Sequence, residues 1–273
     1  MTRRMMGIVA GMAVVLALVP AARADWDVTM PAKWIQMPDA TSSGIDIRVD
    51  QNSGARRVAD DFQCEQPMLI TDVHIWGSWL NDVNNGLQSI KIRFYSDDPA
   101  GPGGTNPSNN YSMPDQVLWG GIVTPTGGTQ PGVVGHFTER EWGTVDYEHF
   151  WDPVPDVWGV DHKIYQFNMY IDPAKAFYQE GTKGKPVIYW LEISAVTNLT
   201  DDQFGWKTRD PQEQHFQDDA VYWGQGGAAP SWQPLEYPSG ESIDMAFVIT
   251  PEPATLAFVS LGLAGLLARR RRK

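Results

Sequence analysis

The sequence predicts an all-β fold, a two-sheet β-sandwich of the jelly-roll type. Short segments alternate apolar and polar residues, which places successive side chains on opposite faces of a strand. Between these segments lie loops rich in turn-forming residues, with 26 Gly and 20 Pro in a chain of 273 residues. No long apolar stripe has the period of a helix. About eight to ten strands joined by long loops are compatible with two packed sheets.

The alternation is clearest in four segments, which are therefore expected to be strands. They are residues 90–95, 165–171, 187–193 and 243–249. Further strands are expected at residues 69–79, 116–123, 133–137 and 220–223. Surface loops are expected at the turn-rich stretches 97–110, 124–132 and 224–240. One short helix is expected after Asp172, with Pro173 at its first position and Gly181 at its end.

Residues 1–24 are typical of a secretory signal peptide. Arg3 and Arg4 form a positive start, residues 7–19 are apolar, and Ala24 closes a small-x-small cleavage site. The mature chain is expected to begin near Asp25.

The last 23 residues, 251–273, form a second targeting segment with three parts. Pro251-Glu252-Pro253 is followed by an apolar segment at 254–268 and by five cationic residues at 269–273. A helix over 254–268 would cover roughly 22 Å, which is short of the ~30 Å hydrocarbon core of a membrane. The segment is therefore expected to be a transient inner-membrane anchor with its cationic end in the cytoplasm.

The chain between these ends is strongly acidic. All 33 Asp and Glu residues precede Pro253, whereas eight of the 21 Lys and Arg residues lie in the two terminal segments. Residues 25–250 therefore have 13 cationic against 32 acidic side chains, since Glu252 lies in the terminal segment. Because phosphate binding needs clustered Lys and Arg, nucleic acid is excluded as a partner.

A single cysteine, Cys64, excludes an intramolecular disulfide, so stability must come from a packed core. Residues 25–250 are long enough for one β-sandwich domain, and its core is expected at about 57–249.

Three tryptophans are the candidate ligand-binding residues. Trp206, Trp223 and Trp232 lie in or beside Gly-rich stretches, close to Asn, Gln and Asp residues. An aromatic ring flanked by polar groups suits stacking against a sugar ring. The alternative is that these large side chains pin long loops onto the sandwich, and the sequence leaves both interpretations open.

Four aspartates are the candidate metal ligands. Ca²⁺ is held by carboxylate and carbonyl oxygens, and Asp201, Asp202, Asp218 and Asp219 could close a structural calcium site in the loops. Solvated loop charge is the alternative. No other cofactor is expected, and no catalytic residues are predicted, because the chain lacks the hydrolase, zinc-protease and nucleotide-binding motifs.

The tail resembles the PEP-CTERM sorting signal of Gram-negative bacteria that make exopolysaccharide. This resemblance implies recognition by an exosortase, a membrane protease, near Pro251-Glu252-Pro253, followed by release or onward export. The body resembles a family of uncharacterised secreted domains over about residues 57–249, which implies a fold and a compartment but no activity. The segments that carry this resemblance are Ala59–Cys64, Ile70–Trp79, Ile188–Ala195, Gly205–Thr208, Asp218–Val221 and Ile243–Ile249.

These observations predict an exported protein of the cell envelope or extracellular matrix, with a non-catalytic structural or binding domain. A secreted carbohydrate-binding module or carbohydrate-active enzyme is the alternative. The expected partners are an exosortase at the inner membrane and exopolysaccharide. The sequence does not predict an oligomeric state.

Overall fold

The all-β prediction is confirmed, because 60% of the described residues are in strands or bridges and 3% are helical. The computed structural model describes residues 25–51, 56–105, 110–212, 216, 219–224, 231–237 and 240–250. The predicted signal peptide, residues 1–24, and the predicted sorting tail, residues 251–273, lie outside the described residues. Met30–Glu252 forms one compact unit, and it is this unit that is described below.

Two short 3₁₀ turns, η1 (Leu80–Asp82) and η2 (Gly101–Gly103), accompany the strands. The described strands are β1 (Trp34–Gln36), β2 (Ile45–Arg48), β3 (Val58–Cys64), β4 (Met68–Ile70), β5 (Asp72–Trp79), β6 (Leu87–Asp98), β7 (Met113–Thr124), β8 (Val133–Asp152), β9 (Val157–Ile171), β10 (Phe177–Gln179), β11 (Val187–Thr197), β12 (Phe204–Lys207), β13 (Val221–Gly224), β14 (Ser231–Pro234) and β15 (Phe247–Ile249).

Thirteen of these strands belong to one hydrogen-bonded sheet, in the order β1-β15-β5-β12-β2-β8-β7-β6-β11-β3-β13-β14, with β9 paired to both β5 and β8. A separate two-stranded sheet pairs β10 with β4. The pairs β2–β8 and β7–β8 are parallel, and the other strand pairs are antiparallel.

Five strands of the large sheet close into a ring. β5 pairs with β12, β12 with β2, β2 with β8, β8 with β9, and β9 with β5 again. Side chains on alternate positions of these strands therefore point either into this ring or away from it, toward the main apolar core or the surface. The ring places residues together that are far apart in the sequence.

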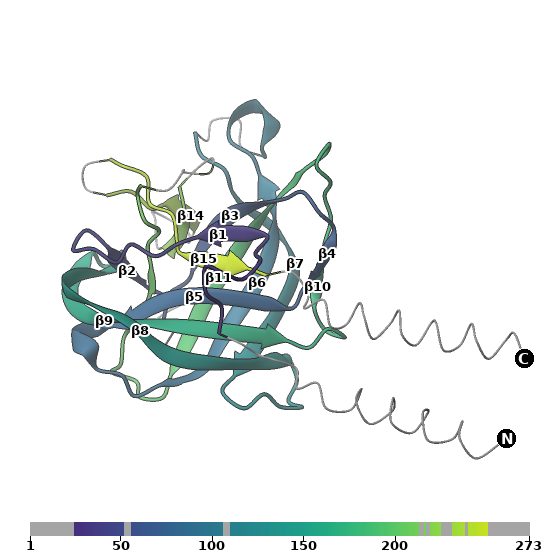
Figure 1. The fold of residues 1–273 in the computed structure, drawn as a ribbon. Coiled ribbons are helices and arrows are strands. Elements are labelled where there is room, and N and C mark those ends of the chain that lie inside the picture. Colours follow the sequence, from purple (N-terminus) through teal and green to yellow (C-terminus); the bar gives the residue numbers. More distant parts are fainter. Residues whose placement is uncertain are drawn as a thin grey trace, which may run out of the picture. The chain divides into compact units, whose positions relative to one another are not determined.

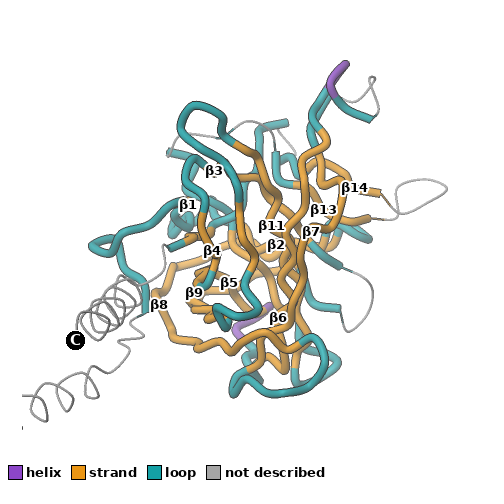
Figure 2. Tube along the Cα trace, turned by 90° about the vertical axis from the view of Figure 1, so that its right-hand side faces the viewer, coloured by secondary structure: helices purple, strands orange, loops and turns teal. Residues whose placement is uncertain are grey.

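The sheet folds over to make two layers, with the apolar core between them. β1, β15, β5 and β9 lie in front of β3, β11 and β6 (Figure 1). In the view turned by 90°, β5, β8 and β9 lie on one side and β7, β11 and β13 on the other (Figure 2). Phe62 of β3 meets Phe247 of β15 across the core, with ring centroids 6.0 Å apart.

The expected strands at 90–95, 165–171 and 187–193 lie within β6, β9 and β11, whereas only residues 247–249 of the expected strand 243–249 form one, β15. The core begins earlier than residue 57, however, because Ile45, Ile47 and Val49 are buried in it. Residues 231–234, expected in a loop, form β14 and pair with β13.

The expected short helix is wrong. The backbone N–H of Lys175 donates to the carbonyl of Asp172, which closes a turn, and the chain then enters β10. Phe177 of β10 pairs with Ile70 of β4 and stacks on Phe94 at a centroid distance of 4.9 Å. Strand pairing and burial of Phe177 therefore outweigh the local helix signals.

The contact between the layers predicts a large effect of Phe247→Ala. The ring is fully buried and touches Phe62 and Trp206, so its loss leaves a cavity between the layers. We expect a loss of about 3–5 kcal/mol in the free energy of unfolding, measured by urea denaturation.

The matched control is Ile35→Ala on the neighbouring strand β1, where the side chain is 48% exposed. It is expected to cost less than about 1 kcal/mol. Equal losses in the two variants would contradict the two-layer core.

Candidate functional site

The structure places two of the three candidate tryptophans in the interior. Trp206 of β12 is 0% exposed, and its indole N–H donates to the carbonyl of Ala246. Trp232 of β14 is 6% exposed and meets the ring of Tyr95 edge-on. The prediction that these two rings form part of a surface face is therefore wrong, because the strands that carry them bury both.

Trp223 of β13 is half-buried and is already stacked. The guanidinium carbon of Arg57 lies 4.2 Å from the centre of its ring, and the same group lies 5.4 Å from the ring of Trp232. This cation–π contact covers one face of Trp223. The sequence signal, a tryptophan near glycines, did not distinguish a packed ring from a free one.

Among the described residues, the candidate calcium ligands Asp201 and Asp202 lie at a different place in the fold from Asp219. Asp202 is buried after β11 and accepts a hydrogen bond from Asn85, and the adjacent Asp201 is exposed. Asp219 precedes β13. The pairing of β13 with β3, and of β3 with β11, places Asp219 level with Trp190. Trp190 lies seven residues, or roughly 23 Å, from the end of β11 near which Asp201 and Asp202 follow. Asp218 and the processing residues Ala24, Pro251, Glu252 and Pro253 lie outside the described residues.

A different set of aromatic residues lies on the surface, and we call it the aromatic strip. It consists of Tyr147, His149 and Trp151 on β8 and Trp158 on β9. Tyr147 is 42% and Trp158 40% exposed. The three residues on β8 are spaced by two, so they share one face of the strand. The Tyr-x-His-x-Trp alternation is visible in the sequence, but these residues were not among the predicted candidates for ligand binding.

The contacts within the aromatic strip fix the orientation of its rings. Trp151 and Trp158 are direct partners in the β8–β9 register, and their rings stack at 5.1 Å with an interplanar angle of 10°. His149 meets Trp158 edge-on at 5.5 Å. Both indole N–H groups donate to Asp156 Oδ1, at 2.9 Å from Trp151 and 3.2 Å from Trp158. Asp156 holds this place from the turn between the strands, at a positive φ of 69° that Asp tolerates.

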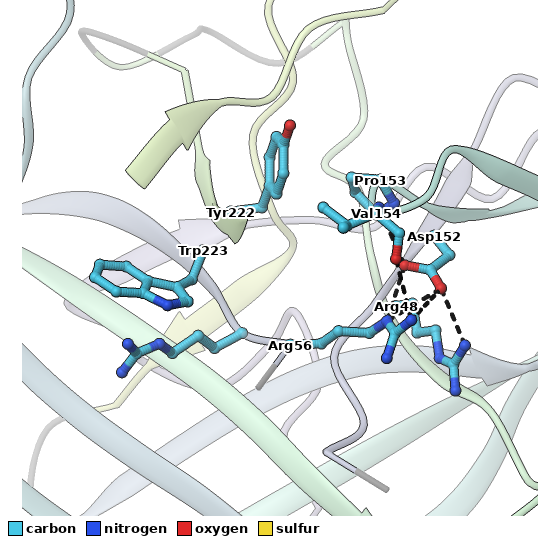
Figure 3. Close-up of a pocket in the computed structure, with 8 residues that line it drawn as sticks. Arg48, Arg56, Asp152, Pro153, Val154, Tyr222 and Trp223 are labelled. Carbon is cyan, nitrogen blue, oxygen red and sulfur yellow. Dashed lines mark hydrogen bonds and ion pairs between the residues drawn. The ribbon is translucent and has the colours of Figure 1, made fainter. Parts of the chain in front are cut away.

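A shallow depression lies at the base of the same β8–β9 turn, between Asp152 and the strand β13 (Figure 3). Arg48 and Arg56 both contact Asp152, at 3.0 and 2.8 Å, and Arg48 also pairs with Asp50. Burial would lower the pKa of Arg48, but these carboxylates raise it above its ordinary value. The arginines are therefore compensated within the protein, and the depression is a structural ion-pair network rather than an anion site.

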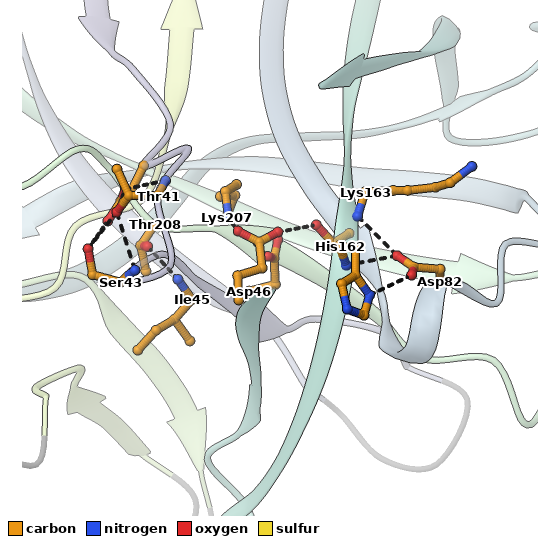
Figure 4. A network of polar contacts seen from close by, with 12 residues as sticks. Thr41, Ser43, Ile45, Asp46, Asp82, His162, Lys163, Lys207 and Thr208 are labelled. Atoms are coloured by element: carbon orange, nitrogen blue, oxygen red, sulfur yellow. Dashed lines mark hydrogen bonds and ion pairs between the residues drawn. The ribbon is translucent and has the colours of Figure 1, made fainter. Parts of the chain in front are cut away.

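The interior of the five-stranded ring holds a group of polar residues that we call the lysine cluster. It contains one residue from each strand of the ring: Ser78 of β5, Lys207 of β12, Asp46 of β2, Glu148 of β8 and Asp161 of β9. All five are 0% exposed. Lys207 Nζ contacts Glu148 Oε2 and lies 3.2 Å from Asp46 Oδ2 (Figure 4), while the Ser78 hydroxyl donates to Glu148 Oε1 at 3.2 Å.

Burial controls the protonation of the lysine cluster. Burial raises the pKa of Asp46 to about 8, against the opposite effect of Lys207. Burial, together with the nearby Asp46 and Glu148, raises the pKa of Asp161 to about 11. Burial alone would lower the pKa of Lys207, but the surrounding carboxylates outweigh it and raise that pKa. At neutral pH, Asp161 is therefore a neutral acid and Lys207 is the cation of the cluster.

The donor set of the lysine cluster resembles a metal site, because oxygens of Asp46, Glu148 and Asp161 lie within 4.8 Å of one another. Ca²⁺ would need six to eight oxygens. Here the Lys207 ammonium lies among the carboxylates and contacts two of them. The cluster therefore already holds a cation of its own.

Residues 32–250 match the family model described as a domain of unknown function, DUF7901. The chain belongs to the DUF7901 family. Residues 250–273 match the PEP-CTERM protein-sorting motif, which confirms the resemblance of the tail and implies a secreted protein that passes through the membrane and is processed by an exosortase. No curated protein and no solved structure matches the chain. No helix among the described residues is long and apolar enough to cross a membrane.

Asp161 predicts how the stability of this DUF7901 domain depends on pH. The unfolded chain releases the Asp161 proton near its ordinary pKa of 3.8, whereas the folded chain keeps it up to about 11. Unfolding therefore releases a proton over this range, so the free energy of unfolding falls as pH rises, by about 1.4 kcal/mol per pH unit for one proton. We expect Asp161→Asn to remove this contribution, measured by urea denaturation at several pH values between 5 and 7.

The control for this prediction is Asp201→Asn, which changes an exposed aspartate. It is expected to keep the pH dependence of the wild type. An Asp161→Asn variant with the same dependence as the wild type would show that Asp161 is ionised in the folded protein.

Proposed function

We propose that this exported domain is a non-catalytic binding domain of the cell envelope or extracellular matrix, and that it contacts polysaccharide through the aromatic strip. The observation that carries the proposal is the stacked pair formed by the half-buried Trp151 and the exposed Trp158. The sorting motif supports the setting, because it belongs to exported proteins. The proposal keeps the sugar-binding interpretation of the sequence but moves it from β12 and β14 to the β8–β9 hairpin.

The geometry of the aromatic strip suits a sugar chain better than a globular partner. Trp158 is 40% exposed, and an exposed indole suits stacking on the C–H groups of a pyranose. The ring is held by Trp151, which stacks on it, and by Asp156 at its edge. Because the orientation is fixed before binding, little conformational entropy is lost when a ligand stacks on it.

Polar groups lie beside these rings to receive sugar hydroxyls. The Tyr147 hydroxyl and the His149 imidazole are 3.3 Å apart on the same face of β8. Tyr147 and Trp151 are four residues apart, which corresponds to about 13 Å along the strand. The aromatic strip is therefore long enough to contact more than one sugar unit of an extended chain.

The alternative of a carbohydrate-active enzyme has less support. Of the carboxylates near the hairpin, Glu148 is 0% exposed and bound to Lys207, Glu139 accepts a hydrogen bond from Asn84, and Glu141 pairs with Lys163 at 3.1 Å. A glycosidase needs two carboxyl groups that both reach the scissile bond. Burial and pairing favour structural roles for these groups.

We expect Trp158→Ala to weaken polysaccharide binding. One stacked ring contributes about 1 kcal/mol, which corresponds to roughly a fivefold change in Kd. Binding is measured by affinity electrophoresis of the exported protein in gels that contain either exopolysaccharide purified from the culture medium or hydroxyethyl cellulose. Repeated copies on one polymer would strengthen such a weak contact.

Tyr178→Ala is the matched control, since Tyr178 is an aromatic side chain on β10 that is 54% exposed. It is expected to migrate as the wild type does. Equal retardation of the Trp158→Ala variant and the wild type, with circular dichroism showing both to be folded, would overturn the aromatic strip as the binding surface. Release of reducing sugar ends by the wild type would favour the enzyme instead.

A further inference from the structure

Within the lysine cluster, the amine of Lys207 and the carboxyl group of Asp46 are in contact, and the proposed sugar binding gives this contact no role. Lys207 of β12 and Asp46 of β2 are direct partners in the antiparallel register, although they are far apart in the sequence. Lys207 Nζ lies 3.2 Å from Asp46 Oδ2, so an amine and a carboxyl group face each other at contact distance. Both side chains are 0% exposed, so neither reaches water or a substrate.

The surroundings of this pair are tightly enclosed. A Cβ atom on Gly44 would lie 2.9 Å from Lys207 Nζ and 3.2 Å from Glu148 Oε2, and one on Gly205 would lie 2.8 Å from the Asp46 Cβ. The backbone therefore closes around the pair at positions where only glycine fits. Such confinement holds the reacting groups at a high effective concentration.

The polar atoms of the lysine cluster are incompletely satisfied. Asp46 Oδ1 is buried without a hydrogen-bond donor, and the neutral Asp161 carboxyl group has only Glu148 beside it as a hydrogen-bond partner. Buried polar atoms without partners are rare and costly. An arrangement with three carboxyl groups around one lysine is therefore an unusual way to stabilise a fold through ion pairing alone.

We propose that Lys207 and Asp46 join in an intramolecular amide cross-link, with Glu148 as the proton carrier. The reaction condenses the amine with the carboxylic acid and releases one water molecule. It needs no oxidant and no cofactor. The proposal is independent of polysaccharide binding, which concerns the other side of the β8–β9 hairpin.

The steps balance within the lysine cluster. The Lys207 ammonium gives one proton to Glu148 Oε2, which it contacts. The neutral amine then attacks the Asp46 carboxyl carbon, and a C–N bond forms. The C–O bond to the hydroxyl oxygen of Asp46 breaks. Glu148 passes its proton to this leaving hydroxyl, which departs as water, and takes the second amine proton in return. The product is a neutral amide beside a neutral Glu148.

The environment favours the reaction. Burial raises the pKa of Asp46 to about 8, so this group is largely the neutral acid that an amine can attack at neutral pH. In water, an amine and a carboxylic acid exist as stable ions, but a buried ion pair bears a large desolvation cost. Conversion into an amide removes two charges from the interior.

A cross-link between β2 and β12 would give this chain a covalent constraint that its cysteine content does not allow. Cys64 is the only cysteine, although an exported protein can form disulfides. A bond between positions 46 and 207 closes a long loop of the chain. Such a constraint reduces the entropy of the unfolded state and resists local opening of the ring.

Mass spectrometry of the exported protein tests the proposal. The intact mass is expected to be lower than that of the mature sequence by one water molecule. Trypsin is expected to release residues 34–48 covalently joined to residues 184–209, because cleavage after the modified Lys207 is blocked and Lys185 precedes proline. Fragmentation of this linked pair locates the bond at Asp46 and Lys207.

Three variants separate the chemistry from folding. Lys207→Arg keeps the charge but removes the amine. This variant is therefore expected to show no loss of water from its intact mass and to release a free peptide 34–48. Glu148→Gln keeps both reacting groups and is expected to leave them unlinked. Lys163→Arg is the control, since this lysine pairs with Glu141 at the surface, and it is expected to keep the link.

Folded wild type with the full mass and a free peptide 34–48 would overturn the proposal, whatever the folding of the variants. A link from Lys207 to the peptide 141–163, which contains Glu148 and Asp161, would overturn the assignment to Asp46.

Discussion

A buried ammonium group surrounded by carboxyl groups is the interaction on which the arrangement of this domain depends. Lys207, Asp46, Glu148 and Asp161 come from four different strands and are all 0% exposed. Each would lose its hydration on folding, so the strands can close into a ring only if these groups meet. Removal of Lys207 would leave the carboxylates without their buried cation, and breaking a buried ion pair in this way typically costs about 3–5 kcal/mol. The cluster therefore specifies which strands are neighbours, and a covalent bond within it would make that choice permanent.

The ring also explains how an apolar core and a polar interior coexist. On β12, Phe204 and Trp206 pack into the main core, while Gly205 and Lys207 face the ring. The alternation of a β-strand separates the two environments by one residue. β8 alternates in the same way: Glu148 points into the ring, and the neighbouring Tyr147 and His149 lie on the aromatic strip. The rigid ring thus provides the support for an exposed binding surface.

Local patterns in the sequence predicted much of the fold and little of the site. The alternation at 90–95 and 187–193 identified β6 and β11, because a strand with one buried face leaves a period of two. The sequence pattern of a strand does not show which other strands it pairs with. Asp46 lies before the predicted core and Lys207 beside a predicted ligand-binding tryptophan, and only the β2–β12 register brings them together. The Gly-rich neighbours of Trp206 and Trp232 left sugar binding and packing both open, and their burial follows from strand pairing that the sequence does not show.

The central claim is that the lysine cluster holds the five-stranded ring together, and hydrogen exchange of Lys207→Met tests it most directly. Methionine removes the amine and the charge but keeps a long apolar side chain. The account predicts that amides of β2, β12 and the adjoining part of β8 exchange faster through local opening, while those of β3, β6 and β11 keep their protection. Unchanged protection in β2 and β12, or an equal loss in every strand, would contradict it.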